Sequence, residues 1–338
     1  MSDPVAAIAR TVLYEGYVLW PYHRSALKNQ KRWTFGGVYP EAYSAAGHQD
    51  DASAIRAECL LEIDTAAELE VTVRFLQVVD RLVARVDDGR ESFVDRVVVR
   101  GESHVAWQEA MERDITLSLS APEGRDNAAH ADVVIDAGEN REPLIEHDGT
   151  LAAAVVRRWD RIAGTIDVET EPADRGVVRV RVHVRNQSQW TGESRDEIQR
   201  RTLVATHVVL RSPTGRFISP IDPPAAYAAA VSLCRNSGVW PVLVGTPPER
   251  GTMLASPIIL YDYPQVAPES GGDFFDAAEI DQLLVLGVLS MTDEEQARMR
   301  ETDPRTRQIL ERCRSVSADE LLRLHGATRE LRGGEAEQ

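Results

Sequence analysis

The sequence predicts an α+β fold: mainly an antiparallel β-sandwich, followed by a C-terminal helical segment. Short runs of alternating apolar and polar residues fill the middle of the chain, and clusters of Gly, Pro, Asp and Asn separate them. Long helical patterns do not alternate with these runs, which argues against a doubly wound parallel sheet. After Gly271 the pattern changes to that of short helices with capping residues.

The clearest strands lie in the middle of the chain. Residues 177–184 read VVRVRVHV, and residues 68–76 alternate in the same way, so each has one buried and one polar face. Residues 203–210 are almost entirely apolar, which is typical of a central strand. Further strands are expected at residues 58–63, 94–99, 114–119, 131–135, 151–159 and 165–169.

The last third of the chain mixes both kinds of element. Residues 225–233 are rich in alanine and predict one helix, while residues 253–261 could form a strand that Pro257 limits. Thr292 with Glu295 and Ser317 with Glu320 fit the capping box of a helix N-terminus, as does an Asp-x-x-Glu pattern at 276–279. Pro304 fits a first helical turn.

Length and composition fit a soluble protein with one large domain or two ordinary ones, since 43% of the 338 residues are hydrophobic and 27% are charged. The patterns divide the chain into five parts: an aromatic and basic segment packed on the main domain (1–50), a β-sandwich domain (51–220), an ordered connection rich in Pro and Gly (221–272), C-terminal helices (273–332) and a disordered tail (333–338).

Residues 14–43 have the most unusual composition. They hold 8 of the 20 aromatic residues and both lysines of the chain, Lys28 and Lys31, whereas the other 36 basic residues are arginines. Tyr, Trp and Arg dominate protein-binding hot spots, so this segment could form an aromatic pocket or a docking surface. Alternatively, it is a strand–loop–strand whose aromatic side chains fill the core of the sandwich and whose cations coat its surface.

A second unusual cluster lies at residues 256–279, where carboxylates and tyrosines alternate with Pro and Gly. It could bind a divalent cation or work in acid–base catalysis, or it could be an ordered linker that caps the following helix. Our hypothesis is that the two clusters pack together, with Lys28 or Arg24 near Asp262 or Glu269. The binding residues predicted from both clusters are Tyr14, Glu15, Tyr17, Trp20, Tyr22, Lys28, Asn29, Trp33, Tyr261, Asp262, Glu269 and Glu279.

Known catalytic signatures are missing from the sequence. It contains no GxSxG, HExxH, Walker or GxGxxG pattern, and its three cysteines, Cys59, Cys234 and Cys313, lie far apart. His207 lies in the most apolar strand, and we interpret it as a hydrogen-bonded core residue in preference to a base or metal ligand. The sequence thus assigns no catalytic residue, metal ligand or cofactor.

The charge balance and the N-terminus suggest a location. A net charge of -16 disfavours binding to nucleic acid or anionic membranes. The N-terminus lacks the pattern of a secretory signal, and no apolar run is long enough to span a membrane. We therefore expect a cytoplasmic protein.

Several long motifs resemble one known family. They read LYEGYVLWPYHRSALKNQKRWTFGGVYPEAY, TLVATHVVL, GRFISPIDPP, ASPIILYDYPQVAPES and FFDAAEIDQLLVLGVLSMTDEE, and are similar to those of conserved hypothetical proteins encoded beside high-affinity, actinobacterial-type nickel–iron (NiFe) hydrogenases. The resemblance covers most of the chain. It implies an accessory role in the assembly, maturation or scaffolding of such a hydrogenase, with a hydrogenase subunit or another maturation factor as partner.

Two functions therefore remain open from the sequence. The first is a non-enzymatic accessory protein that docks a hydrogenase subunit through residues 14–43 and 256–279. The second is an enzyme for a small molecule, with a pocket between these segments, Lys28 as the cation or base, and Asp262 or Glu269 as the acid.

Overall fold

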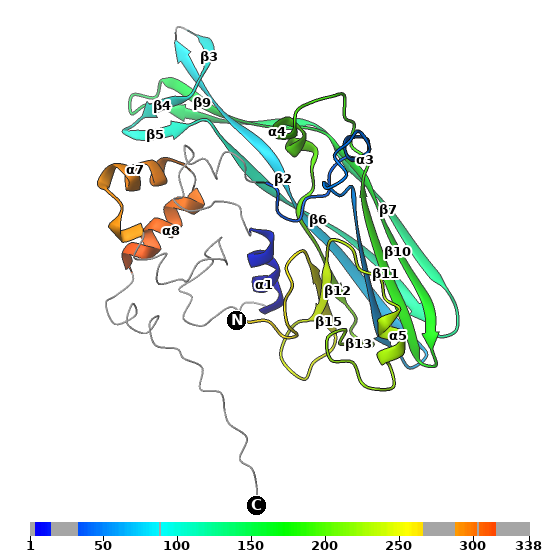
Figure 1. Cartoon of the computed structure of the whole chain (residues 1–338). Helices are drawn as coiled ribbons and strands as arrows, with labels where there is room; N and C mark the ends of the chain where they lie inside the picture. The colour runs from blue at the N-terminus through cyan, green and yellow to red at the C-terminus, as the bar shows by residue number, and fades with distance from the viewer. Residues whose placement is uncertain (1–3, 15–32, 88, 266–287, 303, 316–338) are drawn as a thin grey trace, which may run out of the picture.

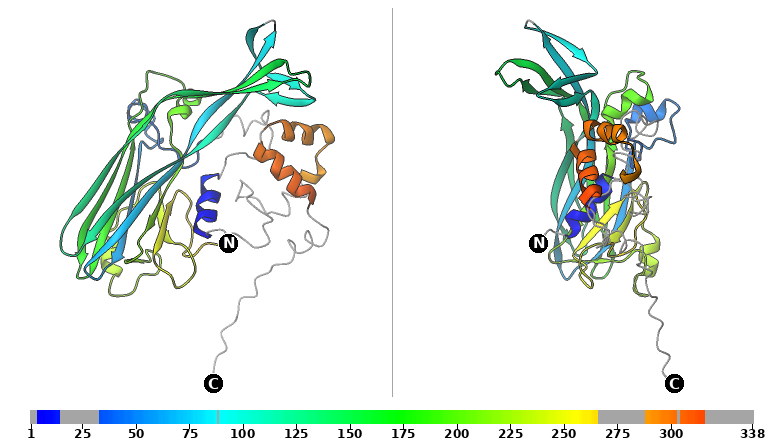
Figure 2. Two further views of the ribbon diagram at one scale, coloured as in Figure 1. Left: turned by 180° about the vertical axis from the view of Figure 1, so that it is seen from behind. Right: turned by 90° about the vertical axis from the view of Figure 1, so that its left-hand side faces the viewer.

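The computed structural model describes residues 4–14, 33–87, 89–265, 288–302 and 304–315. Two antiparallel sheets pack face to face, and short helices lie at both ends of the chain (Figure 1, Figure 2). The predicted mainly antiparallel β-sandwich with C-terminal helices is confirmed.

The smaller sheet has five strands. Their order is β13 (Arg216–Ile218), β1 (Ala54–Glu62), β11 (Val177–Asn186), β10 (Ile162–Asp174) and β7 (Asn127–Ile135). All neighbours are antiparallel. In β11 the valines are buried and the intervening Arg and His residues are half-buried, as the alternation predicted. The outer face of this sheet therefore carries rows of charged side chains.

The larger sheet has eight strands. Six follow the order β14 (Trp240–Leu243), β15 (Thr252–Ser256), β12 (Val204–Arg211), β2 (Ala66–Asp87), β9 (Leu151–Trp159) and β8 (Gly138–Ile145), and both β3 (Arg90–Val94) and β6 (Trp107–Pro122) pair with β2. β15 ends at the residue before Pro257, as the conformational restriction of proline predicted. β12 is buried at every residue up to Leu210, as expected for a central strand.

The main core lies between the two sheets. Phe75 and Val73 of β2 face Val180 of β11 and Phe217 of β13 across it, and all four side chains are fully buried. Aliphatic and aromatic side chains at alternate positions make these strands stable only when one face is covered. We expect that truncation of a residue such as Phe75 to alanine costs about 3–5 kcal/mol.

Strand β2 continues beyond the sandwich, which the sequence analysis did not predict. Its last residues pair with β3 and β9, and the hairpin of β4 (Arg96–Val99) and β5 (Glu102–Val105) packs beside them. Val83, Val97, Val99 and Val155 form a small second core there. We call β3, β4, β5, β8, β9 and the end of β2 the distal lobe (Figure 1).

Helix α1 (Pro4–Leu13) was not predicted either. Val5, Ile8 and Val12 pack on Val209 and Leu254, on the outer face of the eight-stranded sheet. This spacing places the apolar residues on one side of the helix. α1 therefore fixes the position of Tyr14, which follows it.

The other helices are short. They are α3 (Glu41–Ala45), α4 (Arg195–Ile198) with the 3₁₀ turn Gln199–Arg201, α5 (Ala228–Ser232), α7 (Asp293–Thr302) and α8 (Pro304–Ser315). The predicted capping box of α7 is confirmed, since the Glu295 amide donates to Thr292 Oγ1 at 3.2 Å and the Thr292 amide donates to Glu295 Oε2 at 2.8 Å. Pro304 is the first residue of α8, also as predicted. The helices expected near residues 276–286 and 317–320 and the tail 333–338 lie outside the described residues.

Candidate functional site

Tyr14 and Trp33 come together on the outer face of the eight-stranded sheet. They share a buried cluster with Leu76, Val204 and residues of α7 and α8, and they are only 1% and 3% exposed. The Tyr14 hydroxyl donates to Glu112 Oε1 at 2.6 Å, and Trp33 Nε1 donates to Gln108 Oε1 at 3.0 Å. Both rings are buried, but on the outer face of the sheet and not in the core of the sandwich, which the packing alternative expected. They hold the N-terminal segment on the sheet.

A polar track runs beneath them along β6, β2 and β12. Arg74 lies 3.5 Å from Glu112 and 2.9 Å from Asp114, and its cross-strand neighbour is His207. The guanidinium thus balances both carboxylates. Beside this track, Gln108 Nε2 donates to Asp80 at 3.3 Å.

His207 is completely buried in this track. Its Nδ1 lies 2.9 Å from the Ala205 carbonyl, which requires Nδ1 to carry the proton and leaves Nε2 as an acceptor. Burial lowers the pKa of His207 to about 4, so the imidazole is neutral at pH 7. Nε2 has no hydrogen-bond partner among the described residues. His207 is therefore a buried core histidine that is hydrogen-bonded through Nδ1, as the sequence analysis interpreted it, but its Nε2 lacks a partner among the described residues.

The chain is locally strained next to His207. Trp33 and Ala205 have positive φ angles of 70° and 51°, which L-residues rarely adopt. The Ala205 amide donates to the Phe35 carbonyl at 2.9 Å, and the Thr206 amide donates to that of Gly36 at 3.0 Å. This short irregular pairing fastens residues 33–38 to the start of β12.

The two clusters that the sequence singled out are in contact where both are described. A Cβ atom on Gly36 would lie 2.6 Å from Pro257 Cγ, so the main chain of the first segment touches the start of the second. We predicted that Lys28 or Arg24 lies near Asp262 or Glu269. Of these four residues the structure describes only Asp262. The other predicted binding residues outside the described residues are Glu15, Tyr17, Trp20, Tyr22, Asn29 and Glu279.

Asp262 has two hydrogen-bond donors. Its carboxylate accepts the hydroxyl of Ser219 and, at 2.8 Å, the amide of Leu243. The adjacent Tyr263 amide donates to the Leu243 carbonyl at 2.7 Å. Asp262 therefore joins three parts of the chain. Tyr261 beside it points outward and is 83% exposed.

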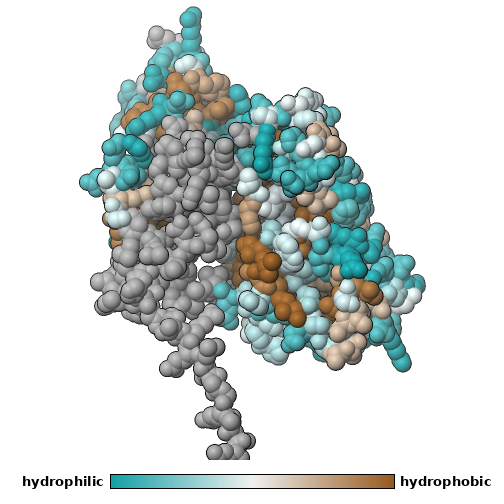
Figure 3. Space-filling model, viewed as in Figure 1, coloured by the Kyte–Doolittle hydropathy of each residue, from teal (hydrophilic) through white to brown (hydrophobic). Residues whose placement is uncertain are grey.

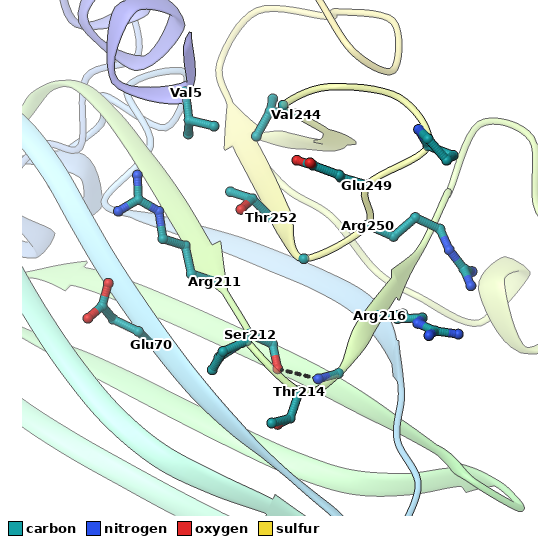
Figure 4. Close-up of a pocket in the computed structure, with 15 residues that line it drawn as sticks. Val5, Glu70, Arg211, Ser212, Thr214, Arg216, Val244, Glu249, Arg250 and Thr252 are labelled. Atoms are coloured by element: carbon teal, nitrogen blue, oxygen red, sulfur yellow. Dashed lines mark hydrogen bonds between the residues drawn. The ribbon is translucent and has the colours of Figure 1, made fainter. Parts of the chain in front are cut away.

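The described residues outline one large groove that the sequence did not reveal. It has a volume of about 1070 Å³ and opens between α1, the turn after β12 and the loop before β15 (Figure 4). Arg211, Arg216, Arg250, Glu70 and Glu249 line it. Both signs of charge are present, so the groove offers no field that would select an anion or a cation. Its residues lie far apart in the sequence, which is why no local motif indicates it.

The described residues contain neither a metal-binding cluster nor a membrane-spanning helix. Among them, no group of three or more His, Cys, Asp or Glu side chains is arranged to hold a metal ion. None of the described helices combines the length and the hydrophobicity that crossing a membrane requires.

No family profile and no curated protein sequence matches this chain. Among solved structures, one similarity is to the secretin InvG of the Salmonella SPI-1 type III secretion injectisome, at 10% identity over 74% of this chain and 75% of that chain, with a TM-score of 0.11. At this TM-score the similarity indicates neither a shared fold nor a shared function.

Proposed function

We propose that this protein is an accessory protein that acts by docking to a partner protein. The observation that carries the proposal is the exposure of three large apolar side chains, Trp240 of β14 and Ile259 and Tyr261 of the loop after β15, which are 43%, 75% and 83% exposed. Apolar side chains that gather on a surface mark sites of protein binding more often than sites of chemistry. We call these three residues the docking surface.

The local chain path places the three residues on neighbouring elements. Ser256 is the cross-strand neighbour of Trp240 at one end of β14, and Tyr263 and Asp262 bond to Leu243 at the other end. The loop 257–262 therefore runs along the edge of β14. Ile258 and Leu260 pack toward α1, so the alternate residues Ile259 and Tyr261 face outward. Figure 3 shows hydrophobic side chains gathered beside β12 and β15 on this side of the molecule.

The loop is also held in place before any partner arrives. Ser256 Oγ donates to the Ile258 carbonyl at 2.8 Å, the Tyr263 hydroxyl donates to the Glu249 carbonyl at 2.9 Å, and Asp262 bridges Ser219 and Leu243. A surface that is already ordered loses little conformational entropy on binding. Such a surface suits docking.

The partner we propose is a NiFe hydrogenase subunit or a hydrogenase maturation factor. Support for this choice is the resemblance of the sequence motifs. Motif 255–270 contains Ile259 and Tyr261, and motif 215–224 contains Ser219, which bonds to Asp262. The alternative, an enzyme with Asp262 as its acid, is less favoured because both Asp262 oxygens accept hydrogen bonds that hold the loop.

A pull-down from the native host tests the proposal. The tagged chain should recover a hydrogenase subunit or maturation factor, and a deletion strain should lose hydrogen uptake. The variant Ile259→Ser/Tyr261→Ser should lose the partner and fail to restore uptake. The matched control is Val98→Ser, since Val98 is 53% exposed in the distal lobe. If no hydrogenase protein is recovered and the deletion strain keeps full uptake, the proposed function is wrong.

A further inference from the structure

Strand β7 forms an open edge of the five-stranded sheet. It is the last strand in the sheet order, and within the described residues no main-chain hydrogen bond joins its other side to another strand. It is nine residues long and contains no Pro, Gly or Lys. Proteins usually protect long edge strands with such residues or with a bulge. The pairing of β7 with β10 is regular from Asn127 to Ile135.

Hydrogen bonds of β10 show which main-chain groups of β7 point outward. The Ala163 amide donates to Ser188 Oγ and the Ala163 carbonyl accepts the Gln187 amide, so both groups of Ala163 point away from β7. Its cross-strand neighbour Val134 is then in a non-hydrogen-bonded pair and points its own amide and carbonyl away from β10. Because hydrogen-bonded and non-hydrogen-bonded pairs alternate along the ladder, the amides and carbonyls of Asp132, His130 and Ala128 also point away from β10.

These four residues also point their side chains to the outer face of the sheet. His130 Nδ1 lies 2.7 Å from Asp167 of β10, and its Nε2 lies 3.3 Å from Asp132. The side chains of His130 and Asp132 are 52% and 74% exposed, and Val134 is 55% exposed. The open edge therefore presents a histidine whose two ring nitrogens both lie against carboxylates, a carboxylate and an apolar residue in alternate positions.

A second copy of β7 fits this edge in one particular register. Antiparallel pairing about a two-fold axis must match residues with outward main-chain groups. An axis at His130 would oppose two histidines, and an axis at Asp132 would oppose two aspartates. An axis at Ala131 places His130 opposite Asp132 of the partner subunit, twice, and Val134 opposite Ala128 of the partner subunit, twice. Opposite charges directly across a sheet stabilise it, and like charges destabilise it.

We propose that the protein forms a symmetric dimer in which β7 pairs with β7 of a second copy, centred on Ala131. The five-stranded sheets then join into one continuous sheet. The residues that would meet on the inner face, Ala129, Ala131 and Val133, are small, so the two backbones can approach to normal strand spacing. One strand per subunit gives an interface at the low end of specific complexes, below about 1,200 Å². Interfaces of this size are typical of weak and transient complexes, so we expect the dimer to dissociate reversibly on dilution.

Sedimentation of the full chain from about 1 to 200 µM tests the dimer. The wild type should shift from monomer to dimer with concentration. Val134→Pro removes an outward amide that the monomer does not use, so it should keep the fold and weaken dimerisation at least tenfold. Val134→Ala shortens the same side chain but keeps the amide, so it should change dimerisation less than threefold. Circular dichroism of both variants verifies that they fold.

A cysteine pair tests the register independently. At the proposed axis, Ala131 faces Ala131 of the partner subunit with Cα atoms about 4.5 Å apart, which a disulfide can bridge. Under mild oxidation Ala131→Cys should give a covalent dimer. Ala129→Cys should stay at the wild-type level, because the residue opposite it is Val133 of the partner subunit. A monomer at every concentration, an assembly larger than a dimer, or equal cross-linking of the two cysteine variants would overturn the proposal.

Discussion

The carboxylate of Asp262 accepts the main-chain amide of Leu243 at 2.8 Å, so a loop residue closes the exposed edge of strand β14. The Tyr263 amide and the Leu243 carbonyl complete this closure. Together with Pro241, which has no amide to offer, these bonds prevent further strands from adding to β14. This edge of the larger sheet is therefore closed, whereas no strand among the described residues pairs with the outer side of β7.

We expect Asp262→Ala to destabilise the protein by about 1–3 kcal/mol, because it leaves the Leu243 amide and the Ser219 hydroxyl without their acceptor. Urea unfolding measures the loss. Asp222→Ala is the control, since Asp222 is exposed and its carboxylate accepts no hydrogen bond from the part of the chain that the structure describes. Partner binding through the docking surface should weaken together with stability. Equal stability of the two variants would contradict the structural role of Asp262.

The buried His207 should make the protein sensitive to mild acid. Burial is the main reason that its pKa is about 4 in the folded state, whereas an unfolded histidine has a pKa of about 6.5. Between these values the unfolded state binds more protons, so the free energy of unfolding should fall as the pH drops from about 6.5 to about 4. The loss approaches about 3 kcal/mol. His207→Leu should flatten this part of the stability profile; an unchanged profile would show that His207 titrates normally.

The exposed His130 should behave in the opposite direction. Hydrogen bonds to Asp167 first, and to Asp132 second, raise its pKa above the ordinary value. Its contribution to stability is present below the pKa of the unfolded histidine and is lost as the pH rises through the pKa of the folded state. An NMR titration of the His130 ring checks the shift. Asp167→Asn should lower the pKa, whereas Asp126→Asn on the neighbouring turn should leave it unchanged.

The sequence predicted the strands whose pattern directly reflects burial. β11 and β12 could be found because alternation, or its complete absence, follows from one or two covered faces. The continuation of β2 into the distal lobe could not be predicted, because the alternation ends at Phe75, residues 75–79 are all buried, and Val83 then packs on a different cluster. Tertiary pairing with β9 and β3 keeps the chain extended there.

The candidate site was predictable only in part, for a similar reason. The composition of residues 14–43 indicated an unusual segment, and Tyr14 and Trp33 do hold it to the sheet. Aromatic content alone does not distinguish a buried anchor from an exposed one, because the same ring serves both. The exposed apolar residue Trp240 lies in a strand of ordinary composition, and only the tertiary pairing of Trp240 with Ser256 and of Leu243 with Asp262 places the loop 257–262 beside β14.

The most strongly bound carboxylate on the outer face of the smaller sheet is that of Glu58. Its side chain is 1% exposed, and Oε1 accepts from Arg56 and from Arg181 at 2.7 Å, while Oε2 accepts the Arg235 amide at 2.7 Å. Burial alone would raise the pKa of Glu58, but these hydrogen bonds outweigh it and lower the pKa. The contribution of Glu58 is thus present above the unfolded pKa of about 4.3 and is lost as the pH falls through the folded value.

Removal of this charge should therefore be costly at neutral pH. We expect Glu58→Gln to lower the free energy of unfolding by about 1.5–3 kcal/mol, because Arg56 and Arg181 lose a charged hydrogen-bond acceptor. Glu171→Gln is the matched control: Glu171 binds Arg179 at 2.7 Å on the same face, but its side chain is 37% exposed. Its replacement should cost less than about 1 kcal/mol. Urea unfolding at pH 7 measures both, and losses of equal size would mean that burial of Glu58 does not strengthen its ion pairs.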